Sequence, residues 1–106
     1  MLVVNRFRVE EPADAFAEQL AAAHEVLASK PGYVDGVVGR NIDDPSLWVL
    51  QTRWVNVGSY RRALSAYDVK VGVVPLLSQA VDEPSAYELV DAAAGDLNEA
   101  RPRELG

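Results

Sequence analysis

SKPGYVDGVVGRNIDDPSLWVLQTRWVNVGSYRRAL, residues 29–64, is the stretch that decides the fold. Turn-forming residues fall at 31–32 and at 43–46, and the runs that follow each of them are suited to pair as an antiparallel hairpin. Trp54 closes the second of these strands, and Tyr60 opens a helix after it. This order indicates a small α+β domain with a pocket between helices and sheet.

The sequence predicts four β-strands, at residues 2–9, 33–40, 47–55 and 85–90. The third is expected at the centre of the sheet. In the first, Asn5 shares a face with Val3, Phe7 and Val9. A buried amide among apolar side chains must find hydrogen bonds or cost about 1–3 kcal/mol. Asn5 is therefore a candidate for function, or for satisfying a helix end or loop.

Two helical regions separate these strands. Residues 13–29 and 60–67 repeat apolar side chains at helical spacing. Asp68 is expected to cap a further helical segment, and Pro75 to kink or restart it. The predicted order β-α-β-β-α-β is the ferredoxin-like arrangement, a four-stranded antiparallel sheet with both helices on one face.

Composition excludes several classes of function. Ten Lys and Arg against sixteen Asp and Glu give a net charge of −6, which disfavours nucleic acid and acidic membranes as partners. The absence of cysteine excludes thiol catalysis and disulfides, and a single histidine, His24, excludes a multi-histidine metal site. No apolar run reaches about 18 residues and no signal peptide is recognised, so a cytoplasmic protein is expected.

Residues 1–91 are predicted to form one domain, and residues 92–106 a C-terminal tail. The sheet face turned away from the helices mixes valines and arginines: Val4, Val49, Val55, Arg6, Arg8 and Arg53. Such a face suits a second copy of the sheet that brings carboxylates, with Glu88 as a candidate. A homodimer built through this face is therefore expected.

The order of elements and several local sequences resemble the antibiotic biosynthesis monooxygenase family. These sequences are NRFRV, KPGYVDG, DDPSLW, TRW and SYRRAL. The resemblance covers residues 1–91 and implies a dimeric α+β barrel with one pocket per subunit between helices and sheet. It also implies one of two chemistries, oxygenation of aromatic polyketides without metal or flavin, or degradation of haem.

The haem-degrading interpretation lacks its axial ligand. Asn5 falls where haem degraders carry a first-strand asparagine important for their chemistry. However, residues 66–77 contain no histidine, and Leu64 stands near the position of their tryptophan beside the haem. Tyr67 is available as a substitute ligand, but nothing singles it out. Haem degradation is the less favoured interpretation, and no cofactor is expected.

The cofactor-free oxygenases match at two positions. Trp54 and Tyr60 fall where that subgroup carries a tryptophan and a tyrosine that line its pocket. Leu50 replaces its asparagine, and residues 68–79 contain no arginine. The resemblance implies Asn5, Trp54 and Tyr60 as catalytic residues, which donate hydrogen bonds to the anion of a small planar aromatic substrate that then reduces O2.

Two classes of function stay open at this point. One is a cofactor-independent monooxygenase for a polyketide- or quinol-like substrate; the other is a small-molecule binding or sensing dimer without turnover. Trp54 and Tyr60 also fit a purely structural role in the core. His24 fits a half-buried structural histidine better than a general base, and Gly36 indicates a bend or a close backbone approach.

Overall fold

The computed structural model describes residues 1–10 and 13–90. Its elements are β1 (Leu2–Arg8), α1 (Ala13–Ala28), β2 (Tyr33–Arg40), β3 (Leu47–Trp54), α2 (Val57–Ser65), α3 (Tyr67–Gly72), α4 (Val74–Leu77) and β4 (Ala86–Tyr87). The predicted ferredoxin-like α+β fold is confirmed, and most predicted ends agree within one or two residues. The predicted tail at residues 92–106 lies outside the described residues.

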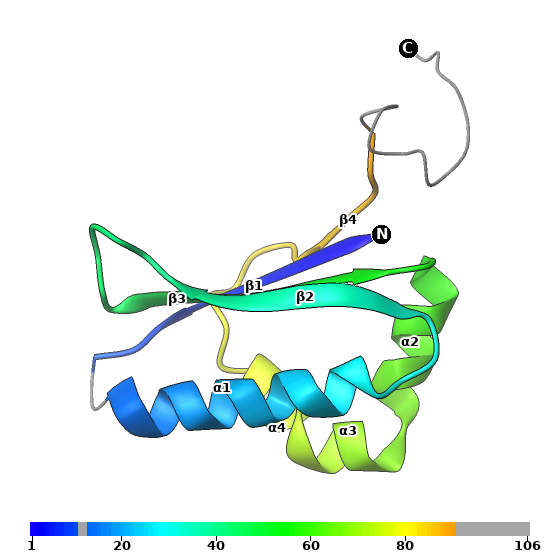
Figure 1. Ribbon diagram of the computed structural model, residues 1–106, viewed down its shortest axis with the longest axis horizontal. Coiled ribbons are helices and arrows are strands. Elements are labelled where there is room, and N and C mark those ends of the chain that lie inside the picture. Colours follow the sequence, from blue (N-terminus) through cyan, green and yellow to red (C-terminus); the bar gives the residue numbers. More distant parts are fainter. Residues whose placement is uncertain (11–12, 91–106) are drawn as a thin grey trace.

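The strands form one antiparallel sheet in the order β2-β3-β1-β4, with the helices on one face (Figure 1). As predicted, β3 is an inner strand. β4 is shorter than predicted, because only Ala86 and Tyr87 pair with β1. Since Tyr87 pairs with Leu2, the first residue of β1, the chain beyond Tyr87 runs past the end of its partner strand.

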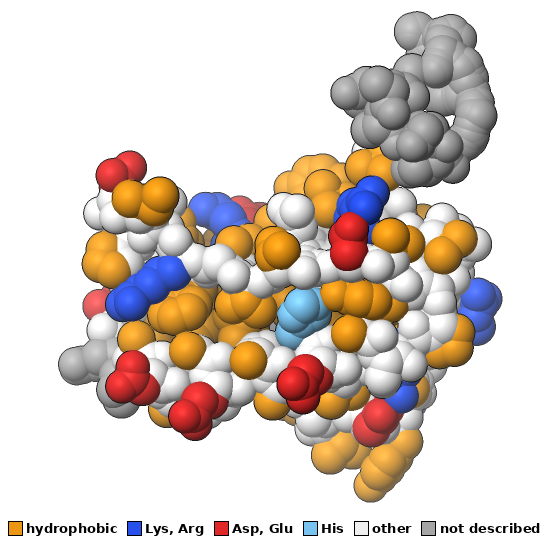
Figure 2. All heavy atoms as spheres, in the orientation of Figure 1, with side chains coloured by type: hydrophobic (Ala, Val, Ile, Leu, Met, Phe, Trp, Pro, Cys, Tyr) orange, Lys and Arg blue, Asp and Glu red, His pale blue; other side chains and the backbone are white. Residues whose placement is uncertain are grey.

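The core lies between the sheet and the helices. From α1 it receives the residues that the apolar spacing predicted: Phe16, Leu20, Ala23 and Leu27. From the sheet it receives alternate residues of β1 and β3, among them Val3, Phe7 and Leu50. Hydrophobic side chains are visible between β2 and α1 (Figure 2).

The second helical region begins earlier than predicted. α2 starts at Val57 because the side chain of Asn56 accepts a hydrogen bond from the backbone N–H of Ser59 (2.8 Å) and so caps the helix. The sequence interpretation overlooked this cap. Tyr60 therefore lies within the first turns of α2 rather than at its start.

The prediction that Asp68 caps the next helix is wrong. The N-cap of α3 is Ala66, which makes no side-chain hydrogen bond. Asp68 lies inside the first turn of α3. Its carboxylate forms an ion pair with Lys30 Nζ at 2.8 Å instead of capping the helix. Pro75 restarts the chain as α4, as predicted, because proline is tolerated in the first turn of a helix.

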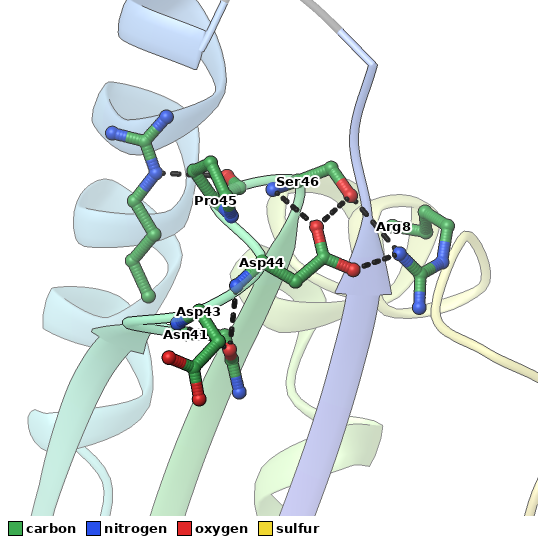
Figure 3. Close-up of polar contacts among 7 residues, drawn as sticks. Arg8, Asn41, Asp43, Asp44, Pro45 and Ser46 are labelled. Atoms are coloured by element: carbon green, nitrogen blue, oxygen red, sulfur yellow. Dashed lines mark hydrogen bonds and ion pairs between the residues drawn. The ribbon is translucent and has the colours of Figure 1, made fainter.

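The turn between β2 and β3 is held by side chains that bond to its own backbone (Figure 3). Asn41 Oδ1 accepts from the backbone N–H groups of Asp43 (2.9 Å) and Asp44 (2.8 Å). Asp44 Oδ1 accepts from the Ser46 N–H (3.1 Å) and hydroxyl (2.7 Å), and its Oδ2 accepts from Arg8 Nη1 (2.7 Å). The turn is thus fixed locally and tied to β1.

The face of the sheet away from the helices carries ion pairs within the chain. These are Arg6–Glu83 (2.7 Å), Arg8–Asp44 (2.7 Å) and Arg53–Asp35 (2.5 Å). Sequence analysis did not predict these partners within the chain. That a second copy brings carboxylates to this face, with Glu88 as a candidate, stays a prediction. The pairs are exposed to solvent, which screens them, so they add little to stability.

Candidate functional site

One aromatic cluster surrounds Trp54 on the helix-facing side of β3. The rings of Tyr33 and Tyr60 lie 5.5 and 5.4 Å from the Trp54 ring, centroid to centroid, and these residues are termed the Trp54 cluster. Trp54 is 2% exposed, and its indole N–H donates to Thr52 Oγ1 at 2.9 Å. The N–H that the sequence interpretation assigned to a substrate already has a partner. Burial raises the pKa of Tyr60, which keeps its phenol protonated at neutral pH.

A second cluster surrounds Trp48 toward the other end of β3. The ring of Phe16 lies edge-on at 5.8 Å, and the guanidinium carbon of Arg40 lies 4.9 Å from the centroid of the Trp48 ring. These residues are termed the Trp48 cluster. Trp48 is 8% exposed, yet its indole nitrogen has no hydrogen-bond partner, the one such sealed side-chain atom in the described part of the chain. Sequence reasoning missed this group, because no local pattern reveals it.

Asn5 lies on β1 in the same helix-facing layer, opposite Leu50. It is 9% exposed, and residues 1–10 and 13–90 offer its carboxamide no hydrogen bond. Its polar atoms are not sealed like the Trp48 nitrogen, so they reach solvent or a small molecule. A carboxamide that lies in an apolar layer and has no partner in the described part of the chain can bond to a small molecule, so Asn5 has the chemistry of a binding group.

The structure brings together two of the three predicted site residues. Trp54 and Tyr60 are in ring contact. Asn5 pairs with Leu50, four residues before Trp54, which places it about 13 Å from Trp54 along the strand direction. Asn5 is closer to Trp48, its diagonal neighbour across the β1–β3 pair at about 7–8 Å.

Tyr60 lines a cavity of about 310 Å³ at the edge of the sheet beside β4. Its walls also include Met1, Leu64 and Tyr87, whereas Asn5 and Trp54 do not border it. A cavity of this size, largely apolar with a phenol in its wall, suits a small planar molecule.

The sequence interpretation took His24 as structural and gave Tyr33 no role, but the structure joins the two. His24 Nε2 lies 2.6 Å from the Tyr33 hydroxyl, and both side chains are half-buried. Burial raises the pKa of Tyr33, and the nearby charge of Asp35 raises it further. The expected close approach at Gly36 is confirmed, because a Cβ there would lie 2.8 Å from Tyr33 Oη and 2.9 Å from His24 Nε2.

The described residues contain no group of three or more His, Cys, Asp or Glu side chains arranged to hold a metal ion. Nor do they form a helix long and apolar enough to cross a membrane. Tyr67, the substitute haem ligand considered above, is 80% exposed and so does not face the interior.

Comparison with known proteins identifies relatives. Residues 1–73 match the family described as antibiotic biosynthesis monooxygenase. A variant of SnoaB, a cofactor-independent oxygenase from Streptomyces nogalater, is 25% identical over 76% of this chain and 82% of its own, with a TM-score of 0.67.

Other solved structures share the fold at lower identity. A conserved protein from Methanosarcina mazei is 22% identical (80% of this chain, 84% of its own; TM-score 0.65). A protein from Nitrosomonas europaea is 17% identical (80% and 82%; TM-score 0.64). No curated protein matches the sequence. These likenesses support the architecture alone.

Proposed function

The chain belongs to the antibiotic biosynthesis monooxygenase family, and from this premise we propose that it is a cofactor-independent monooxygenase. Its substrate is a small planar aromatic molecule, polyketide- or quinol-like, bound between helices and sheet. Asn5, Trp54 and Tyr60 remain the proposed site residues. SnoaB is a cofactor-independent oxygenase, and the similarity to it supports the same chemistry here.

The observation that carries the proposal is the free carboxamide of Asn5. Asn5 as a whole is 9% exposed in an apolar layer, and its carboxamide has no hydrogen-bond partner in the described part of the chain. A fixed amide in such a site can donate to an anionic oxygen of the substrate without first breaking another bond. Trp54 and Tyr60 add aromatic surface at the other end of the layer.

The proposed reaction needs only the substrate and O2. Removal of one proton from an acidic C–H2 group leaves a carbanion, whose electron pair reduces O2 and forms a C–O bond to a hydroperoxide. Loss of water, which takes the second hydrogen of that carbon, leaves a carbonyl. One oxygen atom ends in the product and the other in water. The protein supplies binding, a proton acceptor and stabilisation of the anion.

Oxygen consumption with a panel of hydroxyanthrones and quinols tests this proposal. Wild-type protein should consume O2, and Asn5→Ala should abolish consumption while the melting temperature stays nearly unchanged or rises, because no hydrogen bond is lost. The matched control is Val3→Ala, on the same strand and face, which should lower stability yet keep activity below its melting temperature.

Other outcomes decide against parts of the proposal. Tight binding of the panel compounds without oxygen uptake would favour the alternative, a non-catalytic binding or sensing protein. Survival of activity in Asn5→Ala, together with a melting temperature several degrees lower, would make Asn5 a structural amide and move the site elsewhere.

The homodimer belongs to the same proposal. The open face of the sheet exposes Val37 and Tyr87, and a hollow of about 330 Å³ near Arg6 and Val49 is available to a partner sheet. Because the arginines of this face are paired within the chain, the face can be buried even against a second copy that supplies no carboxylates. These features support a two-fold contact through the sheets.

Sedimentation at micromolar concentration tests the dimer. Val37→Lys should weaken association at least about tenfold, since it puts a charge into an apolar contact. The control is Val71→Lys on α3, where the valine is 58% exposed against 57% for Val37 but lies on the helical side. A wild-type monomer, or equal effects of both variants, would contradict the dimer.

A further inference from the structure

We propose that Tyr33 and His24 form the proton-accepting pair of this protein. Tyr33 takes the proton from the acidic phenol or anthrone substrate while it passes its own hydroxyl proton to His24. This inference rests on the proposed function and names a step that the reaction requires. It assigns a role to the single histidine of the chain.

The two side chains are held in hydrogen-bonding contact by the backbone beneath them. The Nε2–Oη distance is 2.6 Å, within the range for a direct hydrogen bond. The pair lies over Gly36, where any side chain would meet both polar atoms at under 3.0 Å. A glycine at this position therefore leaves the space that the pair occupies.

The pair includes one member of the Trp54 cluster, Tyr33, and both of its side chains are half-buried. Tyr33 packs edge-on against Trp54, and Tyr60 lies on that same indole. In this proposal the substrate packs beside these rings, where its acidic proton reaches the Tyr33 hydroxyl.

The direction of proton transfer follows from the neighbouring groups. Because the pKa of Tyr33 is raised by burial and by Asp35, its phenol keeps its proton at neutral pH. We assign His24 the tautomer that carries its ring proton on Nδ1, in which Nε2 accepts a hydrogen bond from the Tyr33 hydroxyl. When Tyr33 accepts a proton from the substrate, its own proton moves to Nε2. The products are the substrate anion, a neutral Tyr33 and a positively charged His24.

Two other titratable groups near the pair keep their protonation state at neutral pH. The hydrogen bonds from Arg53 lower the pKa of Asp35, so this carboxyl gains a proton only in acid. Burial raises the pKa of Tyr60, so this phenol loses its proton only in base.

Anaerobic binding of a dihydroxyanthrone, followed by absorbance, measures proton transfer separately from the oxygen step. Wild-type protein should bind this probe as its anion. His24→Gln preserves a hydrogen-bonding group but cannot hold the proton, and Tyr33→Phe preserves the ring without the hydroxyl. Both should lower the ionised fraction or the ionisation rate by about 10²-fold or more. Glu25→Gln, an exposed neighbour on α1, is the control and should match wild type.

Each result counts for or against the pair. Wild-type protein that binds the probe without ionising it, or His24→Gln that ionises it normally, would overturn this inference. Absence of oxygen uptake by wild-type protein that does ionise the probe would instead overturn the proposed function.

Discussion

Trp48 and Trp54 lie on the same face of one strand, yet only the indole nitrogen of Trp54 has a hydrogen-bond partner. Trp54 donates to Thr52 and packs between two tyrosines, so its polar atom is satisfied within the chain. Trp48 packs against Phe16 and under Arg40, and its nitrogen has no partner.

The difference shows where unused hydrogen-bonding capacity lies. Asn5, whose carboxamide is also unpartnered among the described residues, is the diagonal neighbour of Trp48 rather than of Trp54. The Trp54 cluster contributes ring surface and, through Tyr33, the contact with His24. The tryptophan that the resemblance implied as a site residue, Trp54, is thus the satisfied one, and Trp48, which it did not imply, is unsatisfied.

The largest expected effect comes from replacing each tryptophan with phenylalanine. Trp54→Phe leaves the buried Thr52 hydroxyl without its donor, whereas Trp48→Phe removes an N–H that has no partner. Urea unfolding should therefore show Trp54→Phe to be the less stable by about 1–3 kcal/mol. In a cycle with Thr52→Val, the Trp54 effect should shrink. Equal losses for both variants would remove the distinction between the clusters.

Glycine substitutions compare the same two ends of the sheet in a second way. Gly36→Ala pushes against two polar side chains and the Gln51 carbonyl oxygen, and should cost about 1–3 kcal/mol. Gly39→Ala, near the Trp48 cluster, meets only a methyl group of Val49 at 3.2 Å and should cost less than about 1 kcal/mol. Melting temperatures of both variants test this order, and a larger loss at Gly39 would reverse it.

The smallest effect on stability is expected in acid. It comes from protonation of two carboxylates at opposite ends of the β2–β3 pair, those of Asp44 and Asp35. Hydrogen bonds from Arg8 and then Ser46 lower the pKa of Asp44 from 3.8 to about 2. Because this pKa is lowered on folding, Asp44 stabilises the protein above its ordinary pKa and ceases to do so as the pH falls toward 2.

The measurement is the melting temperature followed from pH 5 down to pH 2. Asp44→Asn should flatten its decline in the acid range. Asp35→Asn, at the other end, should flatten it less, since the lowered pKa of Asp35 depends on Arg53 alone. A steeper decline in Asp44→Asn than in wild-type protein would contradict the assignment.

Local patterns predicted the fold because its strands and helices end at local signals. The turn-forming residues at 31–32 and 43–46 delimit the hairpin, and the spacing of apolar residues in α1 predicted which of them are buried. The ion pairs were not predicted because Arg6 and Glu83 stand far apart in sequence and meet only when Val81–Tyr87 returns beside β1.

The site was less predictable, because hydrogen-bond satisfaction depends on side-chain positions. Trp54 finds Thr52, two residues away on its own strand, while Trp48 finds no such acceptor. The Tyr33–His24 contact needs a helix and an edge strand to meet over Gly36, and no residue spacing encodes that.

The brevity of β4 has a consequence for the order in which the molecule assembles. Its hold on β1 consists of two residue pairs, with added backbone bonds from Val4 N–H to Ser85 and from Val81 N–H to Arg6 (2.7 Å each). Closing this contact joins distant parts of the chain, whereas the β2–β3 turn closes a short loop at a lower cost in chain entropy.

We therefore expect the β2–β3 hairpin to form early, and β4 to dock last and detach first. While β4 is detached, the edge of β1 is an open template for another strand. The most closely fitting strand in solution is β4 of another copy, so this edge is where molecules of the protein would exchange strands.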